Sequence, residues 1–226
     1  INNIQNITLF QKLRVVFCLF YRFLDFDLRA DVIQKSGMKT LLIVFFLFFS
    51  SLAVAEDISD FEIEGMSIGD SLLDYFSEEE ITSAKKTIYP KSKKYFDVWF
   101  TSKTKLYEEL SIALKENDNK YIIHGVSGVK KFKNNFDQCK KFKKDAIKDL
   151  IHIFPNIKQE DYEYVYKDIE DGKSIAYITD FNLNTGAVRI YCQDWSSITE
   201  NKRGWIDEGR VDISTKLLID WLTIAN

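Results

Sequence analysis

The chain has little histidine, and its residues form no complete catalytic or metal-binding pattern. Only His124 and His152 occur in 226 residues, and neither stands at metal-ligand spacing from another ligand. No glycine-rich phosphate loop is present either. We therefore expect no metal and no cofactor, and the composition favours binding over catalysis.

Residues 38–55 have the pattern of a secretory signal. Lys39 supplies a positive start, an unbroken apolar run covers 41–49, and Ala53-Val54-Ala55 forms the small-x-small pattern that signal peptidase cleaves before Glu56. The apolar run is shorter than the roughly 20 residues that a membrane-spanning helix needs. No cysteine at the cleavage site offers a lipid anchor. The pattern predicts an exported protein, periplasmic or secreted.

Met38 is the first methionine, and we expect residues 1–37 to be upstream sequence outside the native protein. Three of the 34 acidic and six of the 31 basic residues precede Glu56, which leaves 31 acids against 25 bases and a net charge of about −6 in 56–226. This charge argues against nucleic-acid binding. Lysine is abundant in 56–226, as in proteins of AT-rich genomes, whereas the arginines are only Arg189, Arg203 and Arg210.

Two cysteines follow residue 55, and an even number in an exported chain favours a disulfide. Cys139 lies on the apolar stripe of a predicted helix and Cys192 on the apolar side of a predicted strand, so both should face the core. A bridge between them would stabilise the fold by about 4 kcal/mol in the chain-entropy model. The alternatives are two separately buried thiols, or a reactive Cys139 whose thiolate is favoured by neighbouring lysines.

The expected mature chain begins with helical signals. Asp70 can cap a short helix, and Ser77 with Glu80 forms a capping box for a second helix that runs to Pro90. Over 106–115, alternating apolar residues favour a strand, although good helix formers are also present. Aromatic and β-branched residues predict further strands over 94–101 and 121–132.

The second half repeats this order. Periodicity predicts a helix over 134–154, which Pro155 ends. Asp171-Gly172 and Asn184-Thr185-Gly186 mark hairpin turns between strands predicted at 162–169, 173–183 and 187–195. After a looser stretch, Ser214 can cap a final helix that buries Leu217, Leu218, Trp221 and Leu222.

These elements predict an α+β fold, an antiparallel sheet with packed helices, in one mature domain. Its halves, 56–133 and 134–226, would be two tandem units of a helical segment and about three strands. With Gly65-Met66-Ser67-Ile68-Gly69-Asp70-Ser71 at the first helix entry, this order resembles the secreted modules typified by the small outer-membrane assembly lipoproteins and the β-lactamase inhibitor protein. The lipoproteins' anchoring cysteine is missing. The resemblance implies binding or assembly rather than catalysis. Residues 60–77 also resemble the start of uncharacterised secreted proteins of AT-rich marine bacteria.

A second hypothesis is an enzyme. Gly69-Asp70-Ser71-Leu72 resembles the first block of the GDSL esterases and lipases, and the resemblance implies Ser71 as the nucleophile of a serine esterase. A serine nucleophile needs a histidine base. The family supplies this base in a D-x-x-H block near the C-terminus, and neither His124 nor His152 stands in such a block. The alternative role of Ser71 is at a helix N-terminus.

Eight lysines against two aspartates stand between residues 130 and 148. If the apolar stripe of the 134–154 helix faces the sheet, these lysines point outward. Such a surface usually contacts only solvent and has no binding role. The functional alternative is that it docks an anionic envelope component or the acidic surface of an envelope protein. The lysines expected on this surface are Lys140, Lys141, Lys144 and Lys148.

Asp168, Glu170 and Asp171 gather at a predicted hairpin. Their carboxylates could coordinate calcium, but the loop does not match EF-hand spacing, and acids also form turns. For His124 we expect a partly buried position on the strand face of Val126.

Taken together, the residues predict an exported binding or assembly protein, with a GDSL-type esterase as the alternative. We expect no nucleic-acid partner and no transmembrane segment in 56–226.

Overall fold

The computed structural model describes residues 57–89, 91–133 and 135–225. The chain divides into two units, Ile1–Val54 and Ala55–Asn226, and the fold given below is that of the second. The predictions for 1–37, for the signal at 38–55 and for Pro90 lie outside the described residues.

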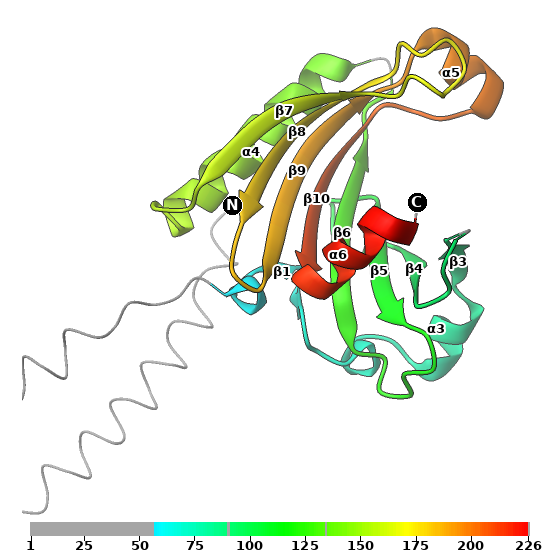
Figure 1. The fold of residues 1–226 in the computed structure, drawn as a ribbon, viewed down its shortest axis with the longest axis vertical. Helices are drawn as coiled ribbons and strands as arrows, with labels where there is room; N and C mark the ends of the chain where they lie inside the picture. Colours follow the sequence, from blue (N-terminus) through cyan, green and yellow to red (C-terminus); the bar gives the residue numbers. More distant parts are fainter. Residues whose placement is uncertain (1–56, 90, 134, 226) are drawn as a thin grey trace, which may run out of the picture. The chain divides into compact units, whose positions relative to one another are not determined.

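The predicted α+β class is confirmed: the described residues form an eight-stranded antiparallel sheet, a two-stranded sheet and four α-helices (Figure 1). The first half contains η1 (Ile58–Asp60), β1 (Glu62–Ile63), β2 (Met66–Ser67), η2 (Leu72–Asp74), α3 (Glu78–Ser83), β3 (Lys85–Ile88), β4 (Tyr95–Thr101), β5 (Glu109–Lys115) and β6 (Ile123–Lys131). The second half contains α4 (Phe136–Ile153), β7 (Gln159–Val165), β8 (Ile175–Asn182), β9 (Gly186–Asp194), α5 (Ser197–Arg203), β10 (Glu208–Thr215) and α6 (Lys216–Ala225).

The two halves share one sheet, whose strand order is β3-β4-β5-β6-β10-β9-β8-β7. Each half contributes four strands, one more than predicted, and the halves meet where β6 pairs with β10. The strand predicted over 106–115 is confirmed as β5, and the long second-half helix is confirmed as α4. The extra strands are β3 and β10.

Helix α3 is shorter than predicted. Ser77 and Glu80 do form the capping box, because the Ser77 N–H donates to Glu80 Oε2 at 2.8 Å and the Glu80 N–H to Ser77 Oγ at 3.3 Å. The helix ends at Ser83, however, and the residues up to Ile88 pair with β4. The Ile88 side chain is 64% exposed, so it anchors no buried helical side.

The stretch predicted to be loose forms β10, which pairs with β6 on one side and β9 on the other. Ser214 belongs to this strand and is not the helix cap. Instead, Thr215 Oγ1 accepts a hydrogen bond from the N–H of Leu218 at 3.1 Å. In α6, Leu218 and Trp221 are buried as expected, whereas Leu217 is exposed.

One face of the sheet, here called the covered face, packs against α4 and the N-terminal segment. The strand registers place Val126, Ile190 and Ile213 on this face, and none of them is more than 2% exposed. A Cβ on Gly209 would lie 2.7 Å from Cδ1 of Phe142. Because glycine lacks this atom, α4 can approach β10 closely.

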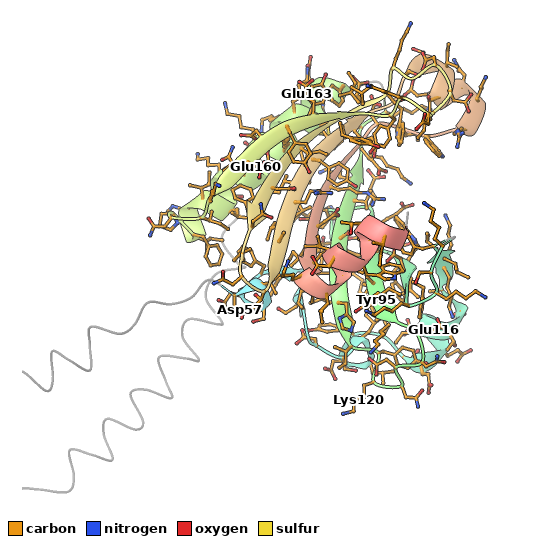
Figure 2. All side chains as sticks on the ribbon, viewed as in Figure 1. Asp57, Tyr95, Glu116, Lys120, Glu160 and Glu163 are labelled. Atoms are coloured by element: carbon orange, nitrogen blue, oxygen red, sulfur yellow. A yellow bond between two sulfur atoms is a disulfide. The ribbon has the colours of Figure 1, made fainter. Side chains whose placement is uncertain are left out.

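Helix α6 covers one end of the opposite face, close to the residue labelled Tyr95 in Figure 2. Its Trp221 contacts Tyr95, with ring centroids 5.1 Å apart. On the same side, a Cβ on Gly125 would lie 2.7 Å from Leu218. We call the rest of this side the open face. It consists of the outward side chains of β4 and β7–β10 and their adjoining loops, principally Asp97, Trp99, Tyr162, Tyr164, Tyr166, Asp180, Arg189, Tyr191, Trp195, Trp205, Glu208, Arg210 and Asp212.

The predicted disulfide is confirmed. Cys139 of α4 and Cys192 of β9 are bonded, with Cα atoms 5.8 Å apart, and both side chains are fully buried. The alternatives of two separate thiols and of a reactive Cys139 are therefore wrong. The bond fixes α4 to the covered face.

Candidate interaction face

The open face gathers residue types that are scarce elsewhere in the chain. Trp99 and Trp195 lie on it, Trp205 packs against Trp195 with ring centroids 4.3 Å apart, and Trp221 of α6 covers its end. These are all the tryptophans of the sequence. The covered face, by contrast, is built mainly from aliphatic side chains and phenylalanine.

The three arginines that follow residue 55 lie on this side as well, each in contact with an aromatic side chain. The guanidinium of Arg210 lies 5.2 Å from the Trp99 ring centroid, and that of Arg203 lies 4.8 Å from the ring of Trp205. Arg189 Nη2 donates to the hydroxyl of Tyr162 at 2.9 Å. Cation–π contacts of this kind orient an arginine while leaving hydrogen-bond donors free.

A row of aromatic rings runs from β7 toward α5. Tyr164 and Tyr166 have centroids 4.8 Å apart, and Tyr166 lies 5.4 Å from Trp195. Tyr164 is 54% exposed, although it is one of the larger apolar side chains of the protein. Exposed aromatic rings that touch one another form a surface that loses little side-chain entropy on binding.

The outer part of the open face is held by a bidentate ion pair between neighbouring strands. Arg189 Nε lies 2.7 Å from Asp180 Oδ1, and its Nη2 lies 2.8 Å from Asp180 Oδ2. Because both oxygens are engaged, the carboxylate fixes the plane of the guanidinium. The Tyr162 hydroxyl also donates to Asp180 at 2.9 Å, which connects β7 to the same group.

Three carboxyl groups surround Arg210 near the middle of the sheet. Burial raises the pKa values of Glu208, Asp212 and Asp97, and the charge of Arg210 partly opposes this in each case. Arg210 Nε lies 2.9 Å from Glu208 Oε1. Asp212 Oδ1 is buried without a hydrogen-bond partner in the described part of the chain. The centre of the open face is therefore polar, and the described residues leave two of its buried polar atoms, Arg210 Nε and Asp212 Oδ1, without a hydrogen bond.

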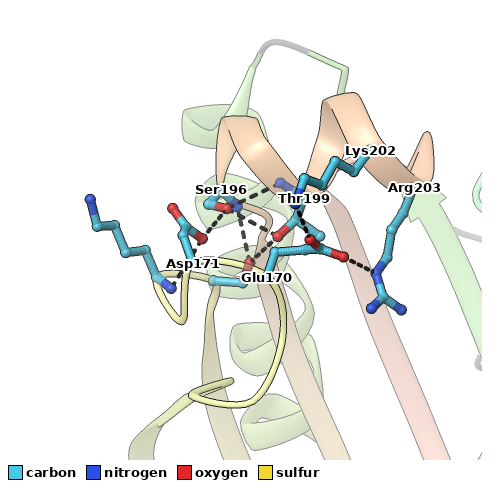
Figure 3. Close-up of polar contacts among 8 residues, drawn as sticks. Glu170, Asp171, Ser196, Thr199, Lys202 and Arg203 are labelled. Atoms are coloured by element: carbon cyan, nitrogen blue, oxygen red, sulfur yellow. Dashed lines mark hydrogen bonds and ion pairs between the residues drawn. The ribbon is translucent and has the colours of Figure 1, made fainter.

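The acidic hairpin is tied to α5 (Figure 3). Glu170 pairs with Lys202 and with Arg203, each at 2.9 Å, and these bonds lower the pKa of its carboxyl group. Asp171 Oδ1 accepts from the hydroxyl of Ser196 at 2.6 Å. These carboxylates thus have cationic or hydroxyl partners, and no group of three metal-ligating side chains occurs among residues 57–89, 91–133 and 135–225.

Ser71 lies at the N-terminus of η2, on the edge of the N-terminal segment. Its hydroxyl donates to the carbonyl of Lys120 at 2.8 Å and accepts from the N–H of Leu73 at 3.3 Å, so it caps this short helix. Asp70, predicted as the cap, instead accepts from the Ser67 N–H at 2.9 Å and from the Tyr75 hydroxyl. No histidine is hydrogen-bonded to Ser71 within the described residues.

The two histidines lie apart from this serine's hydrogen bonds. A register shift after Ala113 places His124 next to Tyr95, with ring centroids 5.1 Å apart, on the α6 side of the sheet rather than on the covered face with Val126. Burial lowers the pKa of His124. His152 is exposed in the last turn of α4.

For Ser71 we expect the substitution Ser71→Ala to leave background hydrolysis of p-nitrophenyl esters unchanged and to destabilise the fold by about 1 kcal/mol through loss of the cap. Ester turnover by the purified chain and urea unfolding measure both effects. Turnover well above background that disappears in the variant would establish the esterase hypothesis instead.

The predicted lysine surface is exposed on α4, at Lys140, Lys141, Lys144 and Lys148. Acids of the same helix compensate part of its charge: Lys141 pairs with Asp145 at 2.8 Å, and Lys140 lies 3.5 Å from Asp137. Its docking role stays a prediction.

The open face was not predicted as a site, although β10 contained its signal. Glu208, Arg210 and Asp212 alternate with smaller or apolar residues, which is the pattern of a strand with one polar face. What no local pattern indicates is that these side chains meet Asp97 of β4 and Arg189 of β9.

Comparison with known proteins gives no match: no family model, no curated protein and no solved structure corresponds to this chain. The resemblances drawn from the sequence therefore stay predictions. No helix among the described residues is both long and apolar enough to cross a membrane. The fold and the site define an α+β protein with one covered and one open sheet face.

Proposed function

We propose that this chain is an exported, non-catalytic binding or assembly protein whose open face binds a folded partner protein in the periplasm or outside the cell. The observation that carries the proposal is the gathering of the tryptophans and of the arginines after residue 55 on one side of the sheet. Trp, Tyr and Arg are the residues that contribute most of the binding energy in protein interfaces.

Export is supported by two independent features. The buried Cys139–Cys192 disulfide belongs to an oxidising environment. The sequence of residues 38–55 has the pattern of a secretory signal that is cleaved before Glu56. Recovery of a mature chain that starts at Glu56 from the periplasm or medium would support the proposal, and intact cytosolic protein would contradict it.

A protein partner fits the open face because the charged groups of this face are spread across several strands. The charged groups run from Asp97 on β4 through Arg210 on β10 to Asp180 on β8. Fixed ion pairs and partly exposed rings give a preorganised surface, so less side-chain entropy is lost on association. An anionic envelope component at the α4 lysines is the second partner class that the sequence predicts.

The test is the affinity of the mature protein for a partner captured from its own envelope fraction. We expect Tyr164→Ala and Arg189→Ala each to weaken binding by tenfold or more, as truncation of a hot-spot residue does. Tyr164 is already 54% exposed, so its removal should leave the fold intact.

Ile153→Ala is the matched control, because Ile153 is 50% exposed but lies on α4. It should leave the affinity unchanged. Equal affinities of wild type, Tyr164→Ala and Arg189→Ala would exclude the open face as the binding surface. In that case, charge reversal at Lys144 and Lys148 would test the α4 surface.

A further inference from the structure

Strand β7 is the last strand on its side of the sheet, and the described residues place no strand beyond it. All seven of its residues are exposed. Figure 2 labels Glu160 and Glu163 on this strand. An end strand of this length offers its backbone to another chain unless something blocks it.

The direction of each backbone group in β7 follows from the register. The Tyr166 N–H donates to the carbonyl of Ser174 at 3.0 Å, so this pair is hydrogen-bonded. Because hydrogen-bonded pairs alternate in an antiparallel ladder, Tyr164 and Tyr162 also direct their backbone groups to β8. The N–H and C=O groups of Asp161 and Glu163 therefore point away from the sheet, toward the open edge.

Among the described residues, neither a proline nor a bulge interrupts this edge. β7 contains no proline, and its pairing with β8 runs without a bulge from Gln159 to Val165. The opposite edge of the sheet, β3, has only four residues. The side chains of β7 nevertheless select the strand that can pair with it, because Glu160, Asp161 and Glu163 are acidic.

The acids disfavour self-association. Antiparallel pairing of two copies of β7 centred on Tyr162 would place Asp161 opposite Glu163, and like charges in directly opposed positions are destabilising. A strand with lysine or arginine at these positions would instead gain from each pair. Charge complementarity thus favours a basic strand over an acidic one at this edge.

We propose that the outer edge of β7 binds an extended, basic segment of a partner protein, which adds a ninth strand to the sheet. Main-chain hydrogen bonds to Asp161 and Glu163 would supply affinity, and their carboxylates would supply selectivity. This surface is the backbone edge of β7, whereas the open face consists of side chains that extend from β7 to β4, so a loss of binding at one surface can be distinguished from a loss at the other.

The probe is an acetylated and amidated nine-residue peptide in which lysine alternates with valine or threonine, titrated at low salt into the mature, disulfide-bonded protein. We expect a Kd of about 100 μM or lower. Hydrogen exchange should slow at the outward amides of Asp161, Glu163 and Val165. The inward amides of Tyr162 and Tyr164 should not change, because β8 already binds them.

Two substitutions at residue 163 distinguish the contribution of its backbone N–H to peptide binding from that of its carboxylate. Glu163→Pro removes an outward N–H but no hydrogen bond to β8, so the fold should persist while peptide affinity falls about tenfold. Glu163→Gln keeps the N–H and should weaken binding about two- to fivefold. Glu116→Gln, at an exposed acid beyond the end of β5, should have no effect.

A peptide N-methylated at alternate residues gives the same test without changing the protein, and it decides the matter if Glu163→Pro does not fold. The proposal is overturned if the basic peptide does not bind at millimolar concentration, or if it binds without the alternating protection. Equal affinity of the N-methylated peptide would overturn it as well. Mutation of Arg210 or Trp195 on the open face should leave peptide binding unchanged.

Discussion

Replacing both bonded cysteines, Cys139→Ala with Cys192→Ala, should lower the free energy of unfolding by about 4 kcal/mol. The bond joins residues separated by 53 positions, and the chain-entropy model assigns a loop of this length roughly that value. Loss of the two sulfur atoms from the core adds a smaller packing term. Small domains are stable by only about 5–15 kcal/mol, so this loss would be a large fraction of the total stability. It is the largest change in stability that we expect from any of the proposed substitutions.

Guanidinium unfolding of the oxidised wild type and the double variant measures the difference. Wild type under reducing conditions is the matched control, since it keeps both side chains and lacks only the bond. It should lose nearly as much stability as the variant. A loss below 1 kcal/mol in both samples would show that the bond contributes little to stability.

Asp207→Asn should stabilise the protein at neutral pH by about 1–3 kcal/mol. The Asp207 side chain is 7% exposed, and its Oδ1 accepts from the Trp195 N–H at 2.8 Å. The pKa of its carboxyl group is raised to about 6, chiefly by burial and to a lesser extent by the charges of Asp194 and Glu200, against the lowering effect of the Trp195 hydrogen bond. Asparagine can accept the same hydrogen bond without a buried charge.

The sign of the pH dependence follows from proton binding. The carboxyl group titrates near 3.8 in the unfolded chain and near 6 in the folded one, so the native state binds more protons between these values. The contribution of Asp207 to unfolding free energy therefore falls as the pH rises from about 4 to about 6 and stays constant above that. Asp207→Asn should match wild type below pH 4 and exceed it above pH 6.

Urea unfolding at pH 4, 5 and 7.5 tests this difference. Glu116→Gln, which removes an exposed carboxylate, is the control and should follow the wild-type profile at every pH. If Asp207→Asn also follows that profile, the buried carboxylate does not affect folding between pH 4 and pH 7.5.

Local sequence patterns were sufficient to predict secondary structure wherever one periodicity dominates a segment. The 3.6-residue stripe with Cys139 and Leu150 predicted α4, and strand-like runs separated by turn signals predicted β8 and β9. The strand predicted over 162–169 lies instead at Gln159–Val165. Local patterns failed at β3, where helix-compatible residues up to Ile88 pair with β4 instead. Such short segments take the conformation that a neighbouring strand stabilises, which propensity cannot reveal.

The same distinction applies to the candidate sites. The sequence by itself predicted the α+β class, favoured the pairing of two core-facing cysteines and predicted the outward lysines of α4, because these predictions rest on the periods of individual elements. Only the tertiary structure decided which strand faces share a surface. Arg189 and Arg210 come together because β9 and β10 are neighbours, and β7 has an open edge because it is last in the strand order. Strand order is a long-range property of the fold, and no local pattern encodes it.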